Sequence, residues 1–348
     1  MVPSRLDAVT GPVTTGRTQG EDCLHLTVTA PLEALTDGRK RPVMVFLHGG
    51  AYVFGGGDLD AYSPVGLAER DLVVINVTLF RESAGADSIF CLMIAEGTQN
   101  LFHRAIFQSA PLGVRLMDRE PMIQRLSELV YKRLTSSQAP RTSEELLSLQ
   151  TELTIAAKSY PSGAMAFGPS LGHAPLPLLS QVPHRIESAA KRVPILIGHT
   201  KHEGAPFAHM NDSLLPYFNL PLVGWLIERL MVWLISRKVF IWDTVKLHRQ
   251  YLKAGGQSRL YKFSWYPSQS PLRSTHCLDL LFLLGTWPHW HDAPMLHGVG
   301  SRNVLERLGN KTKDLWASFA KGETKALGDF DIGGDETFGH IVFHGNNL

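Results

Sequence analysis

Cysteine is scarce in this sequence of 348 residues, which holds only Cys23, Cys91 and Cys277. Neither their number nor their wide spacing is typical of a disulfide framework or of a zinc site. We therefore expect no metal ion and no other cofactor. The scarcity of cysteine fits a reducing compartment without requiring one.

A dominant charge is also missing. The 34 basic and 32 acidic residues are interspersed and leave a formal net charge of +2. This distribution does not predict an electrostatic surface for nucleic acid or for an anionic membrane. The predicted partner is a small molecule, and the oligomeric state is left open.

The sequence has no long hydrophobic run either. Residues 1–20 contain no apolar core segment, so they do not resemble a secretory signal. Residues 214–242 are the most hydrophobic stretch, but prolines and charged residues interrupt it before it reaches the length of a bilayer span. We expect a cytoplasmic protein without a membrane span, in which this stretch is buried in the core or covers a substrate pocket.

The composition does provide for a large core, since 44% of the residues are hydrophobic and 19% are charged. Short apolar runs predict strands at residues 24–29, 43–47, 72–80, 103–108, 194–198, 260–265 and 340–344. The clearest helical patterns lie at residues 121–134, 143–158 and 311–321. This alternation predicts an α/β fold with a mixed or parallel sheet covered on both faces.

Glycine and proline are scattered along the chain and do not gather into a linker. We therefore predict that residues 1–348 form a single domain. The region around residues 205–255 is predicted to be a helical embellishment on it.

A candidate nucleophile lies between residues 77 and 86. A β-rich run leads to Ser83, and small residues follow before a helical pattern. A sharp turn between strand and helix exposes a serine hydroxyl to a base, usually in a Gly-x-Ser-x-Gly pattern. Gly85 matches the second glycine, whereas Arg81 replaces the first and must swing out or push strand and helix apart. Taken alone, the pattern is more often that of an ordinary β-to-α turn than of a catalytic serine.

A candidate oxyanion site lies upstream, where a His-Gly-Gly-Ala segment at residues 48–51 follows a predicted strand. Backbone amides stabilise the tetrahedral oxyanion of ester hydrolysis only where small residues let the chain come close. Gly50 and Ala51 suit this purpose and would act together with the amide of Ala84. The alternatives are a loop that closes a strand or cradles a phosphate, and the lack of a following Lys-Ser/Thr pair disfavours the phosphate.

Together with other segments, the serine turn and the His-Gly-Gly-Ala loop make the sequence similar to the type-B carboxylesterase and cholinesterase family. The matching segments keep the family's order and lie at residues 21–26, 43–51, 76–86, 102–109, 193–204 and 260–285. The resemblance implies an α/β-hydrolase fold, with a mostly parallel central sheet and helices on both faces. It also implies serine ester hydrolase activity.

The resemblance assigns the acid and the base. The family's acid is the glutamate of a turn after a strand, which corresponds to Glu203, and its base corresponds to His276. The order Ser, Glu, His agrees with an α/β-hydrolase triad. His276 would take the proton from Ser83, and Glu203 would fix the imidazole tautomer and stabilise the imidazolium.

Several neighbours of these positions also receive a prediction. Glu82 matches a glutamate that the family keeps beside its active site, and the alternative is an exposed turn carboxylate. Gly49 is predicted to lie beside the active site as well. Cys23 matches a family cysteine that often bridges to an upstream partner, which is missing here, so we expect a free thiol. Four other histidines are not predicted to be the catalytic base. His202, beside the acid, is the main competitor for that role, and the remaining three are interpreted as loop residues: His289, His291 and His297.

The chain departs from the family before Ser83. A strand, an Asn-Tyr-Arg turn and a long helix are missing between the segments that match residues 71–75 and 76–80, and the opening strands of the family are also missing. Parallel neighbouring strands need a crossover of roughly a dozen residues or more, so residues 71–80 must form one strand. The sheet is therefore predicted to lack one strand and one covering helix.

Three hypotheses about function remain. The complete triad and oxyanion loop favour a serine carboxylesterase, a carboxylic ester hydrolase of the EC 3.1.1 type that works through an acyl-enzyme. The deletion and Arg81 favour a catalytically inactive relative of the binding or adhesion type. A third hypothesis is a truncated product that folds poorly.

Overall fold

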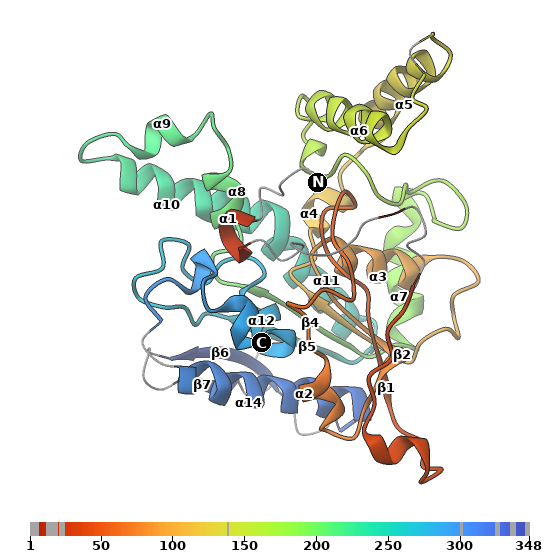
Figure 1. Ribbon diagram of the computed structural model, residues 1–348. Helices are drawn as coiled ribbons and strands as arrows, with labels where there is room; N and C mark the ends of the chain where they lie inside the picture. Colours follow the sequence, from red (N-terminus) through yellow and green to blue (C-terminus); the bar gives the residue numbers. More distant parts are fainter. Residues whose placement is uncertain are drawn as a thin grey trace.

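A seven-stranded sheet forms the centre of the computed structural model, which describes residues 7–11, 20, 25–137, 139–299, 302–323, 328–334 and 339–344, without the side chains of residues 8, 75–77 and 339. Its strands lie side by side in chain order (Figure 1). They are β1 (Val43–Phe46), β2 (Val73–Glu82), β3 (Arg104–Gln108), β4 (Ile195–Thr200), β5 (Ser258–Phe263), β6 (Asp329–Gly334) and β7 (Gly339–His344). β1 to β6 are parallel and β7 is antiparallel to β6, so the predicted mostly parallel sheet is confirmed.

Helices cover both faces of this sheet because its central strands are apolar on both sides. Ile106 and Leu196 belong to one buried cluster, whereas their strand neighbours Phe107 and Ile197 belong to another. Successive strand residues point to opposite faces, so the two clusters lie on opposite sides of the sheet.

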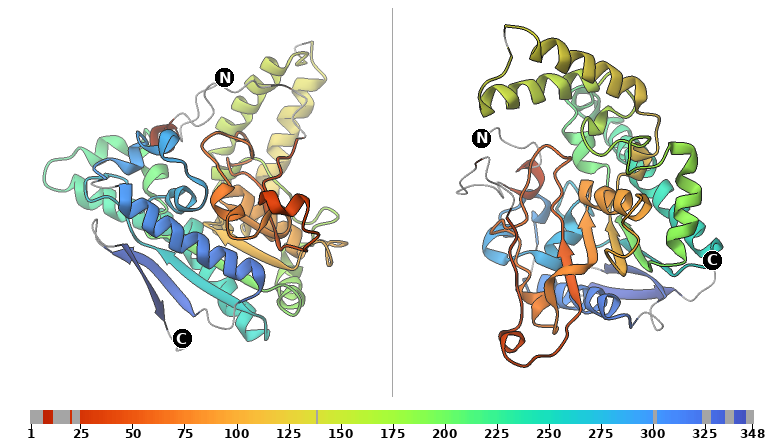
Figure 2. Two further views of the ribbon diagram at one scale, coloured as in Figure 1. Left: turned by 60° about the horizontal axis from the view of Figure 1, so that its bottom comes forward. Right: turned by 90° about the vertical axis from the view of Figure 1, so that its right-hand side faces the viewer.

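One cluster includes side chains of α3 (Ala84–Ile94), α7 (Val182–Ala190) and α11 (Trp242–Lys253). The other includes side chains of α2 (Val65–Ala68), α12 (Leu278–Leu284) and α14 (Arg302–Lys321), and Figure 2 shows α14 running along its side of the sheet. The sheet is therefore the middle of three layers, as the alternating pattern of the sequence predicts.

A hairpin of α5 (Glu120–Leu134) and α6 (Ser143–Ala157) stands away from the sheet (Figure 1). Thr142 caps α6 in a capping box with Glu145, which is the local reason that the helix begins there. The two helices share a small apolar cluster of their own, built on Met122 and Leu153 among others. Both helices were predicted to within one residue at each end.

Other predicted elements need correction. Residues 25–28 form no strand, and Thr29 makes only an isolated antiparallel bridge to Val74; residue 24 lies outside the described residues. The helix predicted at residues 311–321 begins at Arg302, and β6 was not predicted. The remaining short helical segments are α1 (Asp7–Thr10), η1 (Leu32–Leu35), α4 (Leu112–Arg115), η2 (Gly163–Met165), η3 (Leu179–Gln181), α13 (Trp287–Trp290) and η5 (Pro294–Leu296).

The region predicted as a helical embellishment is helical. It contains α8 (Ala205–His209), α9 (Leu215–Phe218), α10 (Gly224–Ile235), a π-helical turn (Ser236–Ile241) and α11. Its last helix packs on β4 and β5, so that part belongs to the layer over the sheet. Among the described residues, no helix combines the length and the apolar character that crossing a bilayer requires.

β2 is a single strand, as predicted, but it changes register against β1. Val43 pairs with Val73, whereas the next residue, Met44, pairs with Thr78. β2 therefore has four residues more than β1 over this step, at the place where the sequence predicts the deletion. From Thr78 onward β2 pairs with both neighbours without interruption, and this part leads to Ser83.

Candidate active site

Ser83 occupies a tight turn between β2 and α3. Its backbone has φ 59° and ψ −130°, a region that a residue with a side chain rarely adopts. The turn is held by the Ser83 amide, which donates to Gln108 O at 3.0 Å, and by the Asp87 amide, which donates to Ser83 O at 3.1 Å. The predicted order of strand, sharp turn and helix is confirmed.

Arg81 did not swing out to solvent. Its side chain is buried, with the guanidinium carbon 5.3 Å from the centre of the Phe46 ring. It fills the space above Gly85, where an added Cβ would lie 2.0 Å from Cδ of Arg81. Burial lowers the pKa of Arg81 to about 9, although the charge of Glu82 opposes that effect. This turn, the nucleophile elbow, thus accommodates Arg81 at the position of the first glycine, because Gly85 at the second glycine position leaves room for the Arg81 side chain.

Glu203 lies in the turn after β4 and is completely buried. Its Oε1 accepts hydrogen bonds from Ser109 Oγ at 2.5 Å and from the Thr200 amide at 2.6 Å. Burial opposes ionisation of this carboxyl, but His276 and these donors hold its pKa below the ordinary value. The carboxylate is therefore fixed in position as an anion.

His276 contacts that carboxylate. Its Nδ1 lies 2.6 Å from Oε2 of Glu203. The rings of Phe207 and Phe240 lie 5.2 and 4.8 Å from the imidazole, centre to centre, and wall it off from solvent. Phe240 comes from the π-helical turn, a local irregularity that is frequent at functional sites. The structure thus brings together the predicted acid and base, which are 73 residues apart.

The competing histidines lie elsewhere. His202 forms a bridge with Thr275 beside the site, and burial lowers its pKa to about 4. His289 lies in α13 and not in a loop, which corrects the prediction, and His291 and His297 are exposed just after short helices.

The second nitrogen of His276 does not face an open site. Oε1 of Glu82 lies 2.8 Å from Nε2, without the alignment of a hydrogen bond. The Cys277 thiol donates to the same oxygen at 3.2 Å. Burial alone would lower the pKa of His276, but the charges of Glu82 and Glu203 outweigh it and raise the pKa to about 10. Glu82 is therefore a buried member of the site and not an exposed turn carboxylate.

A small cavity of about 50 Å³ adjoins Ser83. Its lining includes Gly49 and Gly50 of the predicted oxyanion loop, together with Glu82 and Cys277. An added Cβ on Gly49 would lie 3.6 Å from Cβ of Ser83, so the loop passes directly beside the elbow. Within the described part of the chain, Ala51, Ala84, Glu203 and His276 are not among the residues that line this cavity.

The loop reaches this position through unusual backbone angles. Gly50 has φ 117°, and a Cβ there would lie 1.9 Å from Phe54 O, so only glycine fits. Ala51 and Tyr52 follow with φ 53° and 63°. Three consecutive residues with positive φ turn the chain sharply a few residues after the end of β1.

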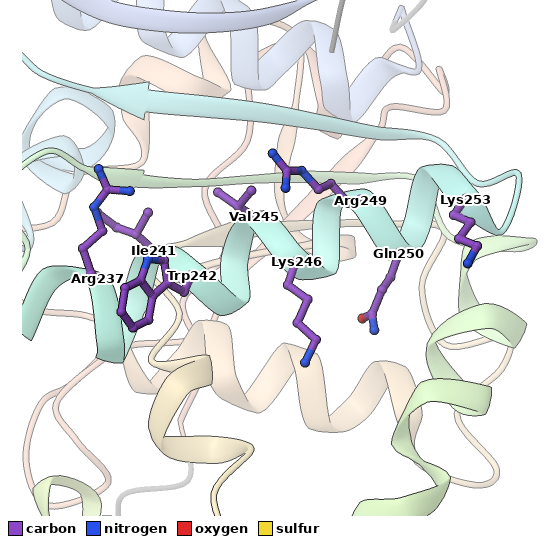
Figure 3. Close-up of a pocket in the computed structure, with 8 residues that line it drawn as sticks. All are labelled: Arg237, Ile241, Trp242, Val245, Lys246, Arg249, Gln250 and Lys253. Carbon is purple, nitrogen blue, oxygen red and sulfur yellow. The ribbon is translucent and has the colours of Figure 1, made fainter.

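A larger cavity of about 440 Å³ lies along α11 and the π-helical turn, where basic and apolar side chains project into it (Figure 3). Its lining residues are Arg237, Ile241, Trp242, Val245, Lys246, Arg249, Gln250 and Lys253. None of these described lining residues is a serine, a cysteine, a histidine or a carboxylate, so its size does not make it the candidate for acyl transfer.

The sequence did not single out Ser109, Phe240 or the placement of Cys277. Ser109 follows β3, and the ends of parallel strands meet at one edge, so its nearness to Glu203 was open to prediction. The other two depend on the π-helical turn and on the left-handed backbone of Cys277, with φ 69°, and the sequence gives no signal for either. Cys23 lies outside the described residues, and its state stays a prediction.

Comparisons with known proteins identify relatives of this chain. The carboxylesterase family profile matches residues 4–77 and 75–215, and the two matches meet where the sequence predicts a deletion. A probable N-octanoylanthranilate hydrolase, AqdA2, of Rhodococcus erythropolis is 28% identical over 366 residues, covering 91% of this chain and 80% of that protein. The para-nitrobenzyl esterase of Bacillus subtilis is 25% identical over 376 residues, covering 87% and 74%.

Solved structures share the fold. A thermophilic para-nitrobenzyl esterase superposes with a TM-score of 0.71 at 21% identity, over 93% of this chain and 82% of that one. Juvenile hormone esterase from Manduca sexta, with OTFP covalently attached, gives 0.66 at 19% identity, over 98% and 84%. The fold is thus that of the carboxylesterases, and since the family profile covers more than half of its length, the chain belongs to the carboxylesterase family.

Proposed function

We propose that this protein hydrolyses carboxylic esters of small molecules, with Ser83 as nucleophile, His276 as general base and Glu203 as the acid that orients it. The observation that carries the proposal is the 2.6 Å contact between Nδ1 of His276 and Oε2 of Glu203. A carboxylate in this position fixes the tautomer and leaves Nε2 for the serine proton.

The reaction would proceed in two halves. Oγ of Ser83 attacks the ester carbonyl while its proton passes to Nε2 of His276, and the amides of Gly50, Ala51 and Ala84 receive the oxyanion. The imidazolium then returns the proton to the leaving alcohol, which gives an acyl-enzyme. A water molecule, deprotonated by the same nitrogen, releases the acid and restores the serine.

Two features must change before substrate reacts. The Glu82 carboxylate, 2.8 Å from Nε2, must give way so that the serine proton can reach that nitrogen. The cavity of about 50 Å³ must also widen, since ligand pockets are typically about 300–1,000 Å³. Asp7 and Thr10 of α1 belong to its lining, so movement of this short helix is one way to open it.

Covalent labelling tests the assignment directly. We expect a fluorophosphonate to modify the parent protein once, with the added mass on the peptide that contains Ser83, and to leave Ser83→Ala unmodified. The parent should also hydrolyse para-nitrophenyl acetate faster than Ser83→Ala. Ser127→Ala serves as the control, because Ser127 is exposed on α5 and does not belong to the cavity lining.

The following combination of results would contradict the proposal. If the parent protein shows a cooperative thermal transition, yet is neither labelled nor faster than Ser83→Ala, the chain is a catalytically inactive relative. A binding function would then be the hypothesis to pursue.

A further inference from the structure

Three side chains of different chemistry converge beside Ser83. Oε1 of Glu82, Nε2 of His276 and Sγ of Cys277 all lie within 4.8 Å of one another, and all three residues are buried. The closest pairs are Glu82 with His276 at 2.8 Å and Cys277 with Glu82 at 3.2 Å. An oxygen, a nitrogen and a sulfur donor thus surround one point.

The imidazole is oriented as a metal ligand would be. Its Nδ1 is bound to Glu203, whereas Nε2 is buried and has no hydrogen-bond partner among the described residues. Histidine ligands in metal sites are typically held by a carboxylate on the nitrogen that faces away from the metal. Glu203 is itself held by Ser109 and by the Thr200 amide, so the ring has little freedom to turn.

We propose that Glu82, His276 and Cys277 form a binding site for a thiophilic divalent transition-metal ion such as Zn²⁺. Zinc takes oxygen and nitrogen ligands at about 2.0–2.2 Å and sulfur at about 2.3 Å in tetrahedral geometry, which sets ligands roughly 3.3–3.7 Å apart. The two shortest separations, 2.8 and 3.2 Å, therefore need to widen by only a few tenths of an ångström or slightly more.

The fourth position is available to water. Glu82 and Cys277 line the cavity of about 50 Å³ beside Ser83, which is enough for a water molecule. A set of one carboxylate, one imidazole and one thiolate is typical of zinc and not of magnesium or calcium, which prefer sites made of oxygen alone. The site should therefore discriminate strongly against Mg²⁺.

Binding releases protons and changes no oxidation state. The metal replaces the proton on Nε2 of the imidazolium and the proton on the thiol, so binding releases protons to the solvent. The bound ion occupies Nε2, the nitrogen that the proposed hydrolase mechanism needs. The metal would thus inhibit ester hydrolysis and is not a cofactor of it.

Cobalt tests the site without any use of enzymatic activity. The chain has three cysteines, so Cys23→Ser/Cys91→Ser leaves Cys277 as its only thiol. We expect this variant to bind one equivalent of Co²⁺ with a thiolate-to-cobalt charge-transfer band. Zn²⁺ should displace the cobalt stoichiometrically, and Mg²⁺ in large excess should not.

Removing a ligand should remove the site. Adding Cys277→Ser to that variant should abolish the band and weaken Zn²⁺ binding at least tenfold, and Glu82→Gln should weaken it similarly with all thiols retained. Zn²⁺ should raise the thermal midpoint of the protein with Cys277 and not of the one without it. The proposal would be overturned by a charge-transfer band that persists without Cys277. It would also be overturned if neither the parent nor the Cys23→Ser/Cys91→Ser variant bound the metal one-to-one.

The esterase proposal can fail independently, since these readouts involve no substrate. An active enzyme should be inhibited by Zn²⁺ over the concentration range in which the metal binds, and chelation should restore it. A protein that binds the metal but is not labelled at Ser83 would leave the metal site standing alone.

Discussion

Glu82 holds its Oε1 2.8 Å from Nε2 of His276, the nitrogen that would have to accept the proton of Ser83. A second carboxylate, Glu203, lies 2.6 Å from the other nitrogen of the ring. An imidazole between two buried carboxylates is held in its charged form, in which it cannot act as a base. The site is thus in a resting arrangement, and several measurable consequences arise from it.

The pH profile should reveal this arrangement. The pKa of His276 is raised to about 10, so the neutral base is scarce at pH 7 and becomes abundant only as the pH rises through that value. We expect kcat/KM for para-nitrophenyl acetate to rise with pH, about tenfold per unit well below the pKa, and to level off above it.

Removing one carboxylate should move that profile. Glu82→Gln takes away a negative charge beside Nε2, so the midpoint should move toward lower pH and kcat/KM at pH 7 should increase by about tenfold for each unit of movement. Glu128→Gln, in the exposed part of α5, is the control and should leave the midpoint in place. A parent profile with its midpoint near pH 7, unaffected by Glu82→Gln, contradicts the prediction.

Ser109 should position the acid. Ser109→Ala removes the 2.5 Å hydrogen bond to Oε1 of Glu203 and leaves only the Thr200 amide on that oxygen. Hydrogen bonds to charged groups contribute about 1.5–3 kcal/mol, so urea unfolding should show a loss of that order. We expect kcat to fall several-fold with little change in KM.

A matched serine separates this effect from loss of any buried hydroxyl. Ser270 is also buried, and its Oγ has no hydrogen-bond partner among the described residues. Ser270→Ala should therefore not lower the free energy of unfolding, because it removes a buried hydroxyl without breaking a hydrogen bond, and it should leave kcat unchanged. Equal effects of the two substitutions would show that Ser109 has no special role.

Arg81 and Gly85 should respond to mutation together. A Cβ at position 85 would lie 2.0 Å from Cδ of Arg81, so Gly85→Ala should destabilise the protein by about 1–3 kcal/mol in urea unfolding. In an Arg81→Gly background the same substitution should have little effect, because the clash is gone. A double-mutant cycle with additive changes would refute the coupling.

The acyl chain that the enzyme accepts should be short. The cavity beside Ser83 measures about 50 Å³, and Leu280 of α12 belongs to its lining whereas Leu281 does not. Both leucines are buried in the same cluster, so Leu280→Ala and Leu281→Ala should each lower the free energy of unfolding by about 2–4 kcal/mol. Only Leu280→Ala should shift the preference of para-nitrophenyl esters from acetate toward butyrate and hexanoate. A similar shift in both variants would mean that loosened packing, and not cavity shape, sets the preference.

Much of the sheet could be predicted from the sequence because its inner strands are continuous apolar runs. The inner strands β3 and β4 lie within two residues of their predicted ends, and so does β1, an edge strand that is only partly buried. β6 was not predicted from the sequence because Asp329, Asp331 and two glycines interrupt its apolar pattern. It is held by pairing with β5 and β7, which local sequence does not express.

The candidate site was predicted in part, for a similar reason. Ser83 has a local signature, whereas Glu203 and His276 were assigned only through resemblance, because one glutamate among many and one of fifteen histidines carry no local signal. The contact between Glu82 and His276 spans most of the chain and depends on the turn that precedes α12. The proximity of Glu82 to Nε2 of His276 therefore could not be predicted from the spacing of residues in the sequence.

The register change divides β2 into two parts with different roles. Val73 completes the pairing at the start of β1, and from Thr78 on the strand aligns with β3 and delivers Ser83 to its turn. The four residues in surplus between them have no partner in β1, and the first of them, Val74, pairs with Thr29 instead. An engineer could open the chain there and insert the strand-and-helix cassette of a longer relative without rebuilding the elbow downstream.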